Sequence, residues 1–291
     1  MTAGAEEQNK KSGDEKSLGT PCVCCLGVMS TPSHAGLVRC SGCGHVRADL
    51  SWTPEMFREL YTEEYFKGGE YADYEEEGPA LRLNFRRRVN ELAALHPEGS
   101  ALWEIGCAYG FFLKEASTHF SAAGCDVAEE AVRCAVEKQG VNAHCLNYLE
   151  HVSDKPFDII CLWDVIEHLP EPHRFLEKAL EELRPGGTLA LSTGDIGSLC
   201  ARLRGARWRQ IHPPTHVHYF TRHSMTTLLE RLGYTDISFR YHAFWRNMDT
   251  VAEKLLAAGP LYRALHRLGL LHFNFPLNLY DLMTVYARKP E

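Results

Sequence analysis

The sequence lacks three features, each of which would indicate a particular class of protein. The 291-residue chain has no uncharged apolar run of roughly 18 residues, so it predicts no membrane-spanning helix. Its start is polar and charged, without the apolar segment of a secretory signal. Its formal net charge of −7 argues against nonspecific nucleic-acid binding, because phosphates require a basic surface. We therefore expect a cytoplasmic protein without a membrane partner, and the charge disfavours a nucleic-acid partner.

The composition is that of a globular protein. Hydrophobic residues make up 45% of the chain and charged residues 24%, which suffices for a sizeable core. The length fits one large domain, or one domain with a small appendage, and residues 1–20 predict a disordered tail. The eleven cysteines are an odd number, and without a secretory signal they predict reduced thiols.

Four of the cysteines form two pairs with the spacing of a metal site. Cys22 and Cys25 are separated by two residues, and so are Cys40 and Cys43. Each pair can form a turn that presents two thiolates to one tetrahedral ion, so we predict a structural zinc ribbon. Cys24 is a rival ligand whose position beside Cys25 does not fit such a turn. The alternative is a set of free cysteines.

Strand and helix patterns alternate from residue 101 onward. Such alternation predicts an α/β fold with a doubly wound, mostly parallel sheet. We expect strands at 101–105, 121–126, 143–146, 157–163, 188–192, 235–241 and 282–287. Helices are expected at 80–95, 110–117, 129–138, 172–183, 224–232 and 247–268, with a turn at 185–187.

A glycine-bearing turn follows the first of these strands. The strand ends at Glu104, and Gly106 and Gly110 lie in the turn, where a backbone without side chains lets a ligand approach closely. Asp126 ends the second strand, and an acid at that place can hold ribose hydroxyls. The turn alone is a weak indication, because any strand-to-helix connection can contain glycine.

Three motifs together resemble the class I S-adenosylmethionine-dependent methyltransferases. They are Glu104-Ile-Gly106-Cys107-Ala108-Tyr109-Gly110, the stretch from Phe157 to Leu169 that contains Trp163-Asp164-Val165-Ile166-Glu167-His168, and Leu183-Arg184-Pro185-Gly186-Gly187-Thr188-Leu189. The resemblance covers roughly residues 80 to 290 and implies a seven-stranded sheet. Ala108 departs from the pattern, because many members have glycine there.

The resemblance also implies a set of donor-binding residues. Gly106 and Gly110 would line the methionine part of S-adenosylmethionine, Asp126 the ribose and Val127 the adenine. The full set it implies is Glu104, Gly106, Cys107, Gly110, Asp126, Val127, Asn147, Tyr148, Trp163 and Asp164.

The cysteine-rich segment resembles the zinc-ribbon module that precedes many bacterial methyltransferases of sugars, nucleotide sugars and natural products. In those proteins the module is followed by an element matched here by Leu60-Tyr61-Thr62-Glu63-Glu64-Tyr65-Phe66. A site with four cysteines has no open position, so the zinc would be structural. The implied organisation is a tail (1–20), a ribbon (21–50), a helical linker or lid (51–97) and a methyltransferase domain (98–291). That domain would contain a substrate loop (195–222) and a helical insertion (247–268).

The acceptor chemistry is expected from acids and histidines near the ends of the fourth and fifth strands. If a helical turn begins at Asp164, then Asp164, Glu167 and His168 share one face. In an extended segment His216 and His218 point the same way. We therefore take Glu167, His168, His216 and His218 as the candidate catalytic residues.

Three interpretations of these four residues remain open. They could hold a divalent ion that activates an acceptor hydroxyl, work as metal-free acid–base groups, or only pack. A similar acid-x-x-Glu-His set with a distant histidine occurs in the small-RNA 2′-O-methyltransferases and ubiquinone-pathway O-methyltransferases. This chain has Asp164 where those proteins tend to have Glu.

Side chains before and within the histidine segment suggest the kind of acceptor. Arginine suits anionic groups, so we expect either an anionic acceptor or a solvated helix face from Arg202, Arg204, Arg207 and Arg209. Trp208 and Tyr219 could stack on a sugar or aromatic ring.

The leading interpretation is a methyltransferase of small molecules, acting at oxygen on a sugar, nucleotide sugar or natural product. An RNA or protein methyltransferase that uses the ribbon for recognition is the alternative, and the acidic charge balance disfavours it. A third interpretation is a zinc-binding interaction protein without enzymatic activity.

Overall fold

The computed structural model describes residues 20–33, 36–49 and 74–291. The predicted tail at 1–20, apart from Thr20, lies outside these residues, as do residues 51–73 of the predicted linker and the Leu60–Phe66 element. None of the described helices is long and apolar enough to span a bilayer.

The main sheet confirms the predicted α/β class. Among the described residues it has seven strands in the order β10-β13-β8-β7-β4-β5-β6. The five strands from β4 to β8 pair in parallel, and β13 runs antiparallel to both β8 and β10. The bounds in sheet order are β10 (Thr235–Arg240), β13 (Leu282–Arg288), β8 (Leu183–Gly194), β7 (Phe157–Trp163), β4 (Ala101–Ile105), β5 (Ser121–Asp126) and β6 (Ala143–Cys145).

The strand order places a ligand crevice next to β4. The chain moves outward from β4 to β5 and β6, and then returns to the other side of β4 with β7. Where the order reverses in this way, the loops at the carboxyl ends of the strands diverge and leave a crevice. The predicted glycine turn and Asp126 both lie at this edge of the sheet.

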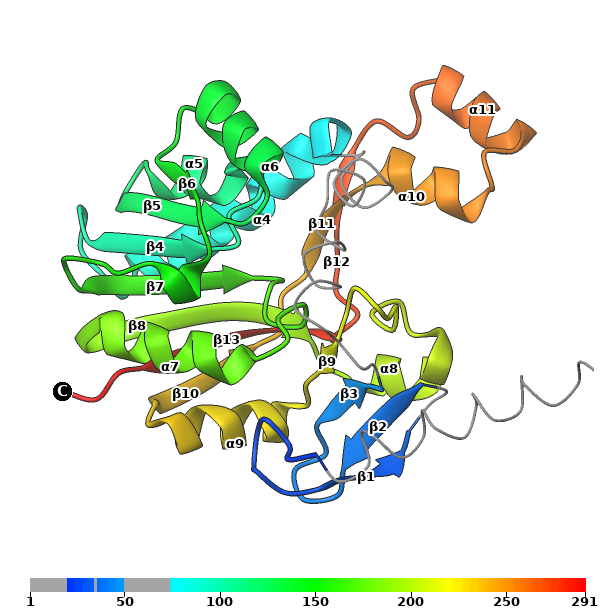
Figure 1. Cartoon of the computed structure of the whole chain (residues 1–291). Helices are drawn as coiled ribbons and strands as arrows, with labels where there is room; N and C mark the ends of the chain where they lie inside the picture. The colour runs from blue at the N-terminus through cyan, green and yellow to red at the C-terminus, as the bar shows by residue number, and fades with distance from the viewer. Residues whose placement is uncertain (1–19, 34–35, 50–73) are drawn as a thin grey trace, which may run out of the picture.

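Alternation along the strands separates two apolar layers. Leu102 and Ile159 point into one layer, whereas Trp103 and Ile160 point into the other. Figure 1 shows α4 (Tyr74–Ala93), α5 (Phe111–Ala116) and α6 (Glu129–Cys134) on one face of the sheet, and α7 (Pro172–Glu182) and α9 (Arg222–Leu232) on the other. The helices predicted at 80–95, 110–117, 172–183 and 224–232 are therefore confirmed.

The turn predicted at 185–187 is instead part of β8. This strand begins at Leu183, which pairs with Phe157, and an irregularity in the register precedes Ile159. Gly186 has a φ of +73°, and a Cβ on Gly187 would lie 2.8 Å from the carbonyl oxygen of Arg184. The glycines thus permit a sharp distortion within a strand that continues through it.

The cysteine-rich segment is joined to the large α/β domain by a shared sheet. β1 (Met29–Pro32), β2 (Leu37–Cys40) and β3 (Val46–Ala48) are extended by β9 (His218–Tyr219), which comes much later in the chain. Figure 1 shows this sheet beside α8 (Leu199–Arg204). Ribbon residues such as Cys22 and Met29 also belong to the same apolar cluster as Ile160 and Leu228. The predicted ribbon is therefore not an independent unit.

The predicted helical insertion is carried on a two-stranded stem. β11 (Phe244–Asn247) pairs with β12 (Asn274–Leu277), and between them lie α10 (Met248–Leu255) and α11 (Pro260–Arg267). The side-chain amide of Asn84 on α4 accepts a hydrogen bond from the Trp245 N–H and donates one to the Trp245 carbonyl. The stem is thus held against α4.

Candidate functional site

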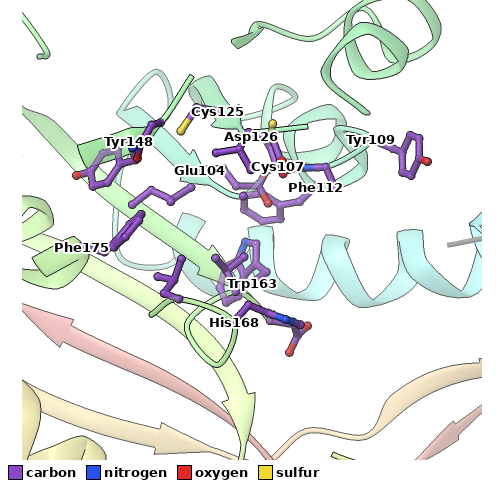
Figure 2. Close-up of a pocket in the computed structure, with 18 of the residues that line it drawn as sticks. Glu104, Cys107, Tyr109, Phe112, Cys125, Asp126, Tyr148, Trp163, His168 and Phe175 are labelled. Atoms are coloured by element: carbon purple, nitrogen blue, oxygen red, sulfur yellow. Dashed lines mark hydrogen bonds between the residues drawn. The ribbon is translucent and has the colours of Figure 1, made fainter. Parts of the chain in front are cut away.

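A cavity of about 1060 Å³ opens at the carboxyl ends of β4, β5 and β7. In Figure 2, Glu104 and Asp126 lie together on one side of Trp163, and His168 lies on the opposite side. Nine of the ten predicted donor-binding residues line the cavity: Glu104, Gly106, Cys107, Asp126, Val127, Asn147, Tyr148, Trp163 and Asp164. Asn84 and Arg88 of α4 and Phe244 of β11 complete another part of its wall.

Gly106 is required where the first turn passes β7. Its φ is +75°, and a Cβ on it would lie 2.5 Å from Cγ2 of Val165. The Gly106 and Cys107 N–H groups both donate to the carbonyl oxygen of Cys125, which ties the turn to β5. The turn is therefore fixed in shape before any ligand binds.

Asp126 is held as an acceptor at the end of β5. Its carboxylate accepts hydrogen bonds from the backbone N–H groups of Ala108 (2.8 Å) and Ala128 (3.0 Å). Burial raises the pKa of this carboxyl, and the two N–H donors oppose the rise. Each oxygen keeps a further lone pair that can accept a hydrogen bond from a ligand hydroxyl.

Gly110 does not line the cavity, contrary to prediction. It precedes α5 with a φ of +74°, and a Cβ there would lie 2.8 Å from side-chain atoms of both Ala135 and Val141. The glycine is needed because the start of α5 packs closely on Ala135 and Val141, which follow α6.

Glu104 places a buried carboxyl on the cavity wall. Burial raises its pKa well above the usual range, and Arg88 opposes that rise. Its Oε2 has no hydrogen-bond partner among the described residues. A ligand that donates a hydrogen bond or carries a positive charge would satisfy this oxygen.

Arg88 is a site residue that the sequence analysis missed. The buried guanidinium donates to Ser192 (3.1 Å) and Asp164 (3.4 Å), and its Cζ lies 4.4 Å from the centre of the Trp163 ring. The available signal was the apolar stripe of α4, in which Asn84 and Arg88 fall between Leu81, Phe85 and Leu92. Polar residues on the buried face of a helix indicate a site.

The helical turn expected at Asp164 does not form. Asp164 has a φ of +55°, and it is held by Ser192, which donates to its Oδ1 (2.9 Å), and by Arg88. Its carboxylate therefore belongs to the Arg88 network, and Asp164 does not share a helical face with Glu167 and His168.

Glu167, His168 and His216 nevertheless come together. Each residue has one atom that could bind a metal ion, and these three atoms lie within 4.8 Å of one another. The ring centroids of His168 and His216 are 4.5 Å apart. His168 lines the cavity, whereas Glu167 and His216 lie behind it. The structure thus groups three of the four predicted catalytic residues.

The protonation of the cluster follows from its burial. Burial, assisted by Asp164, raises the pKa of Glu167 to about 8, and burial lowers the pKa of His168 to about 4 and that of His216 to about 2. Nδ1 of His168 lies 2.9 Å from the carbonyl oxygen of Thr215, and Nδ1 of His216 lies 2.9 Å from that of Gln210. A carbonyl only accepts, so Nδ1 carries the proton and Nε2 the lone pair.

His218, the fourth predicted catalytic residue, lies outside the cavity. It is fully buried between the ribbon and the large domain, with Nδ1 3.0 Å from Nε2 of His45 and Nε2 3.2 Å from the Pro170 carbonyl. His216 and His218 do not point the same way as predicted, because only His218 belongs to β9: His216 precedes the strand and contacts His168, whereas His218 contacts His45 of the ribbon.

The predicted substrate loop stands behind the cavity. None of its residues, 195–222, lines the cavity. Trp208 is buried and donates to Asp281 (2.9 Å), Arg209 forms an ion pair with the same carboxylate (3.0 Å), and the Tyr219 hydroxyl donates to the His216 carbonyl. These residues hold the fold together, and Arg202, Arg204 and Arg207 face solvent.

The four predicted zinc ligands converge. The Sγ atoms of Cys22 and Cys43 are 3.6 Å apart, those of Cys25 and Cys40 are 3.4 Å apart, and all four lie within 4.8 Å of one another. Zinc–sulfur bonds of about 2.3 Å in a tetrahedron require separations near these values. The residues fit a structural zinc ion.

Comparison with known proteins identifies the domain. A family model described as a methyltransferase domain matches residues 78–238. A ubiquinone biosynthesis O-methyltransferase of Hydrogenovibrio crunogenus is 24% identical over 157 residues, which cover 51% of this chain and 62% of that protein. The Caulobacter vibrioides protein of the same name is 27% identical over 131 residues (41% and 52%). The chain spans about half the length of the curated relatives it matches.

Solved structures share the fold. A methyltransferase of Thermotoga maritima, described as a possible histamine N-methyltransferase, superposes with a TM-score of 0.53 at 18% identity over 78% of this chain and 97% of that one. A methyltransferase of Archaeoglobus fulgidus gives 0.50 at 19% identity over the same shares.

The ribbon geometry makes a prediction about zinc. Cys25→Ser should remove a ligand and lower the zinc content, whereas Cys24→Ala should leave it at about one ion per chain, because a Cys₄ site needs no fifth thiol. Cys24 is a matched control, since it is a buried thiol beside Cys22 and Cys43. Zinc would be measured by mass spectrometry after dialysis against a weak chelator. Equal losses in the two variants would show that the ligand set is different.

Proposed function

We propose, because the chain belongs to the methyltransferase domain family, that it transfers a methyl group from S-adenosylmethionine to an oxygen atom of a small molecule. The observation that carries this proposal is the single cavity that connects the glycine turn and Asp126 with His168. Pockets for one drug-sized ligand measure roughly 300–1,000 Å³, so a cavity of about 1060 Å³ has room for a donor and an acceptor.

The donor would occupy the end of the cavity near β4 and β5. Gly106 and Cys107 would face its methionine part, and Asp126 would accept hydrogen bonds from the ribose hydroxyls. Val127, Asn147 and Tyr148 would flank the adenine. The unpartnered Oε2 of Glu104 would accept a hydrogen bond from the donor's ammonium group.

His168 would orient the acceptor hydroxyl. Its Nδ1–H is fixed on Thr215, so Nε2 presents a lone pair that can accept the hydroxyl hydrogen. As the acceptor oxygen forms its bond to the methyl carbon, the carbon–sulfur bond breaks, its electron pair stays on sulfur, and the hydroxyl proton passes to the base. The products are the methyl ether and S-adenosylhomocysteine.

A metal-assisted version of this reaction is a second candidate. The pKa of about 4 makes His168 a weak base, and the buried Oε2 of Glu167 has no hydrogen-bond partner among the described residues. Glu167, His168 and His216 would hold a divalent cation, and the backbone carbonyls of Thr215 and Gln210 already fix both histidine tautomers. When bound, the cation would lower the pKa of the acceptor hydroxyl.

The acceptor class follows from the remaining wall. Phe85, Phe112, Phe175 and Phe244 give the cavity flat apolar surfaces, which suit a ring-bearing natural product. The relatives named for ubiquinone biosynthesis support a hydroxyl on such a ring. Arg174, which pairs with Glu171 (2.7 Å), is an exposed arginine of the cavity wall that could meet an anionic substituent, whereas none of the arginines predicted at 202–209 lines the cavity.

The donor site can be tested at two glycines. Gly106→Ala should weaken S-adenosylhomocysteine binding by at least about tenfold, because a Cβ would collide with Val165 and move the turn. Gly140→Ala is the control: its φ of +66° imposes similar backbone strain, but no atom lies within 4 Å and it does not line the cavity. Titration calorimetry would measure both. Equal affinities in the two variants would place the donor elsewhere.

The proposed role of His168 predicts that its substitution lowers turnover but leaves donor binding unchanged. His168→Ala should lower kcat by roughly 10²–10⁴-fold, the usual contribution of a proton-transfer group, and leave donor affinity within about twofold. His223→Ala, an exposed histidine on α9, is the control. Radiolabelled methyl transfer to a panel of phenols and sugars would provide the rates. An active His168→Ala enzyme would remove this residue from the chemistry.

Chelation distinguishes the metal-assisted from the metal-free reaction. With a cation held by Glu167, His168 and His216, EDTA should abolish transfer and added Mg²⁺ or Zn²⁺ should restore it. The zinc content of the ribbon must be measured in the same samples, because its loss would confound the result. Full activity in EDTA with the ribbon zinc retained would establish the metal-free reaction.

A further inference from the structure

We infer that the cysteine ribbon is a positioning element of the acceptor site, and that His218 and His45 are the residues that transmit its position to Glu167 and His168. The inference rests on the proposed function for its catalytic consequence, but its structural part can be tested separately. It assigns the ribbon a role in this chain's own reaction and not in recognition of a macromolecule.

The first connection runs through the backbone. Strand β9 pairs with ribbon strand β3, with Val46 opposite Tyr219 and Arg47 opposite His218, and the Ala48 N–H donates to the Val217 carbonyl (2.8 Å). The N–H groups of Val217 (2.8 Å) and His218 (3.0 Å) both donate to the carbonyl oxygen of Glu167. One short segment is therefore bonded to the ribbon on one side and to Glu167 on the other.

The second connection runs through buried side chains. The Pro170 carbonyl only accepts, so His218 donates to it from Nε2 and accepts at Nδ1 from the Nε2–H of His45. The His45 and His218 rings are stacked with centroids 5.2 Å apart and are almost completely buried. Pro170 lines the cavity two residues after His168. His45 thus reaches the cavity wall through a single intervening ring.

The ribbon depends on the same contacts. Cys22, Met29 and Val38 pack into the apolar cluster of the large sheet, together with Phe220 that follows β9. The His45 carbonyl accepts from the Cys40 N–H (2.8 Å), so His45 is fixed to the cysteine turn. Loss of the ribbon's fold would therefore release β9 as well.

This arrangement predicts a specific defect. No described ribbon residue lines the cavity, and the donor turn is bonded to β5 and not to the ribbon. Releasing the ribbon should therefore misplace Glu167 and His168 while leaving donor binding intact. A shift of about 1 Å at a reacting group is sufficient to cost on the order of 10²-fold in rate.

Three variants test the inference. His218→Phe keeps a flat buried ring but removes both hydrogen bonds, and should lower kcat at least about tenfold. His218→Gln can accept from His45 and donate to Pro170, and should recover most of that loss. Arg231→Ala is the matched control: it removes two hydrogen bonds from α9 to the carbonyls of Val23 and Cys24, at a part of the ribbon that is not bonded to Glu167.

The readouts separate positioning from general damage. S-adenosylhomocysteine affinity should stay within about twofold in all three variants. Hydrogen exchange should become faster in His218→Phe at the amides of Val217 and His218, which donate to Glu167, and remain unchanged at residues 106–110. Zinc-depleted wild-type protein should show the same exchange pattern, which gives a measurement without substitution if His218→Phe does not fold.

The outcomes are distinct. Unchanged kcat and exchange in His218→Phe would overturn the inference, as would a loss of donor affinity in parallel with kcat, or an equal kcat loss in Arg231→Ala. If the wild-type protein binds S-adenosylhomocysteine but methylates no acceptor, the proposed function fails, while the exchange measurements still decide whether the ribbon positions Glu167.

Discussion

The carbonyl oxygen of Glu167 accepts two backbone hydrogen bonds, and the arrangement of the acceptor half of the cavity depends on them. They hold the connection that follows β7 against the start of β9. Without them this connection would be a free loop. As a result the Glu167 carboxyl and the His168 ring are held between the cavity and the ribbon. A pair of ordinary backbone hydrogen bonds, each worth about 1 kcal/mol, has this effect because the two donors are consecutive residues at the start of β9, which pairs with the ribbon.

The cavity is also defined by an imbalance of buried charge. Glu104, Asp126 and Glu167 are nearly inaccessible to solvent, and Arg88 is the buried cation among the described residues of the wall. Burying a carboxylate without a cationic partner is unfavourable unless another group compensates. A sulfonium donor with an ammonium group would supply positive charge at this place. Burial also raises the pKa values of Glu104, Asp126 and Glu167.

Strands that are marked by a local pattern in the sequence could be predicted. The direction of a side chain could not be predicted where it depends on residues that are distant in the sequence. The bounds of β4, β5 and β7 were predicted correctly, because each is an apolar run that ends at a glycine or an acid. The direction of His218 was not predictable, since it depends on pairing with a strand some 170 residues earlier in the chain. Trp208 and Tyr219 were misassigned for a related reason: their polar atoms are satisfied by Asp281 and His216 within the fold.

The stem of β11 and β12 has a consequence for how such a protein can diversify. Its strands begin and end opposite each other, at Phe244 with Leu277 and at Asn247 with Asn274. The helical tip between Asn247 and Asn274 is therefore joined to the domain through this one paired stem. Phe244, at the base, is part of the cavity wall. The fold thus separates a tip of which no described residue lines the cavity from a base that does line it, so a change of acceptor preference is expected from substitutions at Phe244 and not from exchange of the tip.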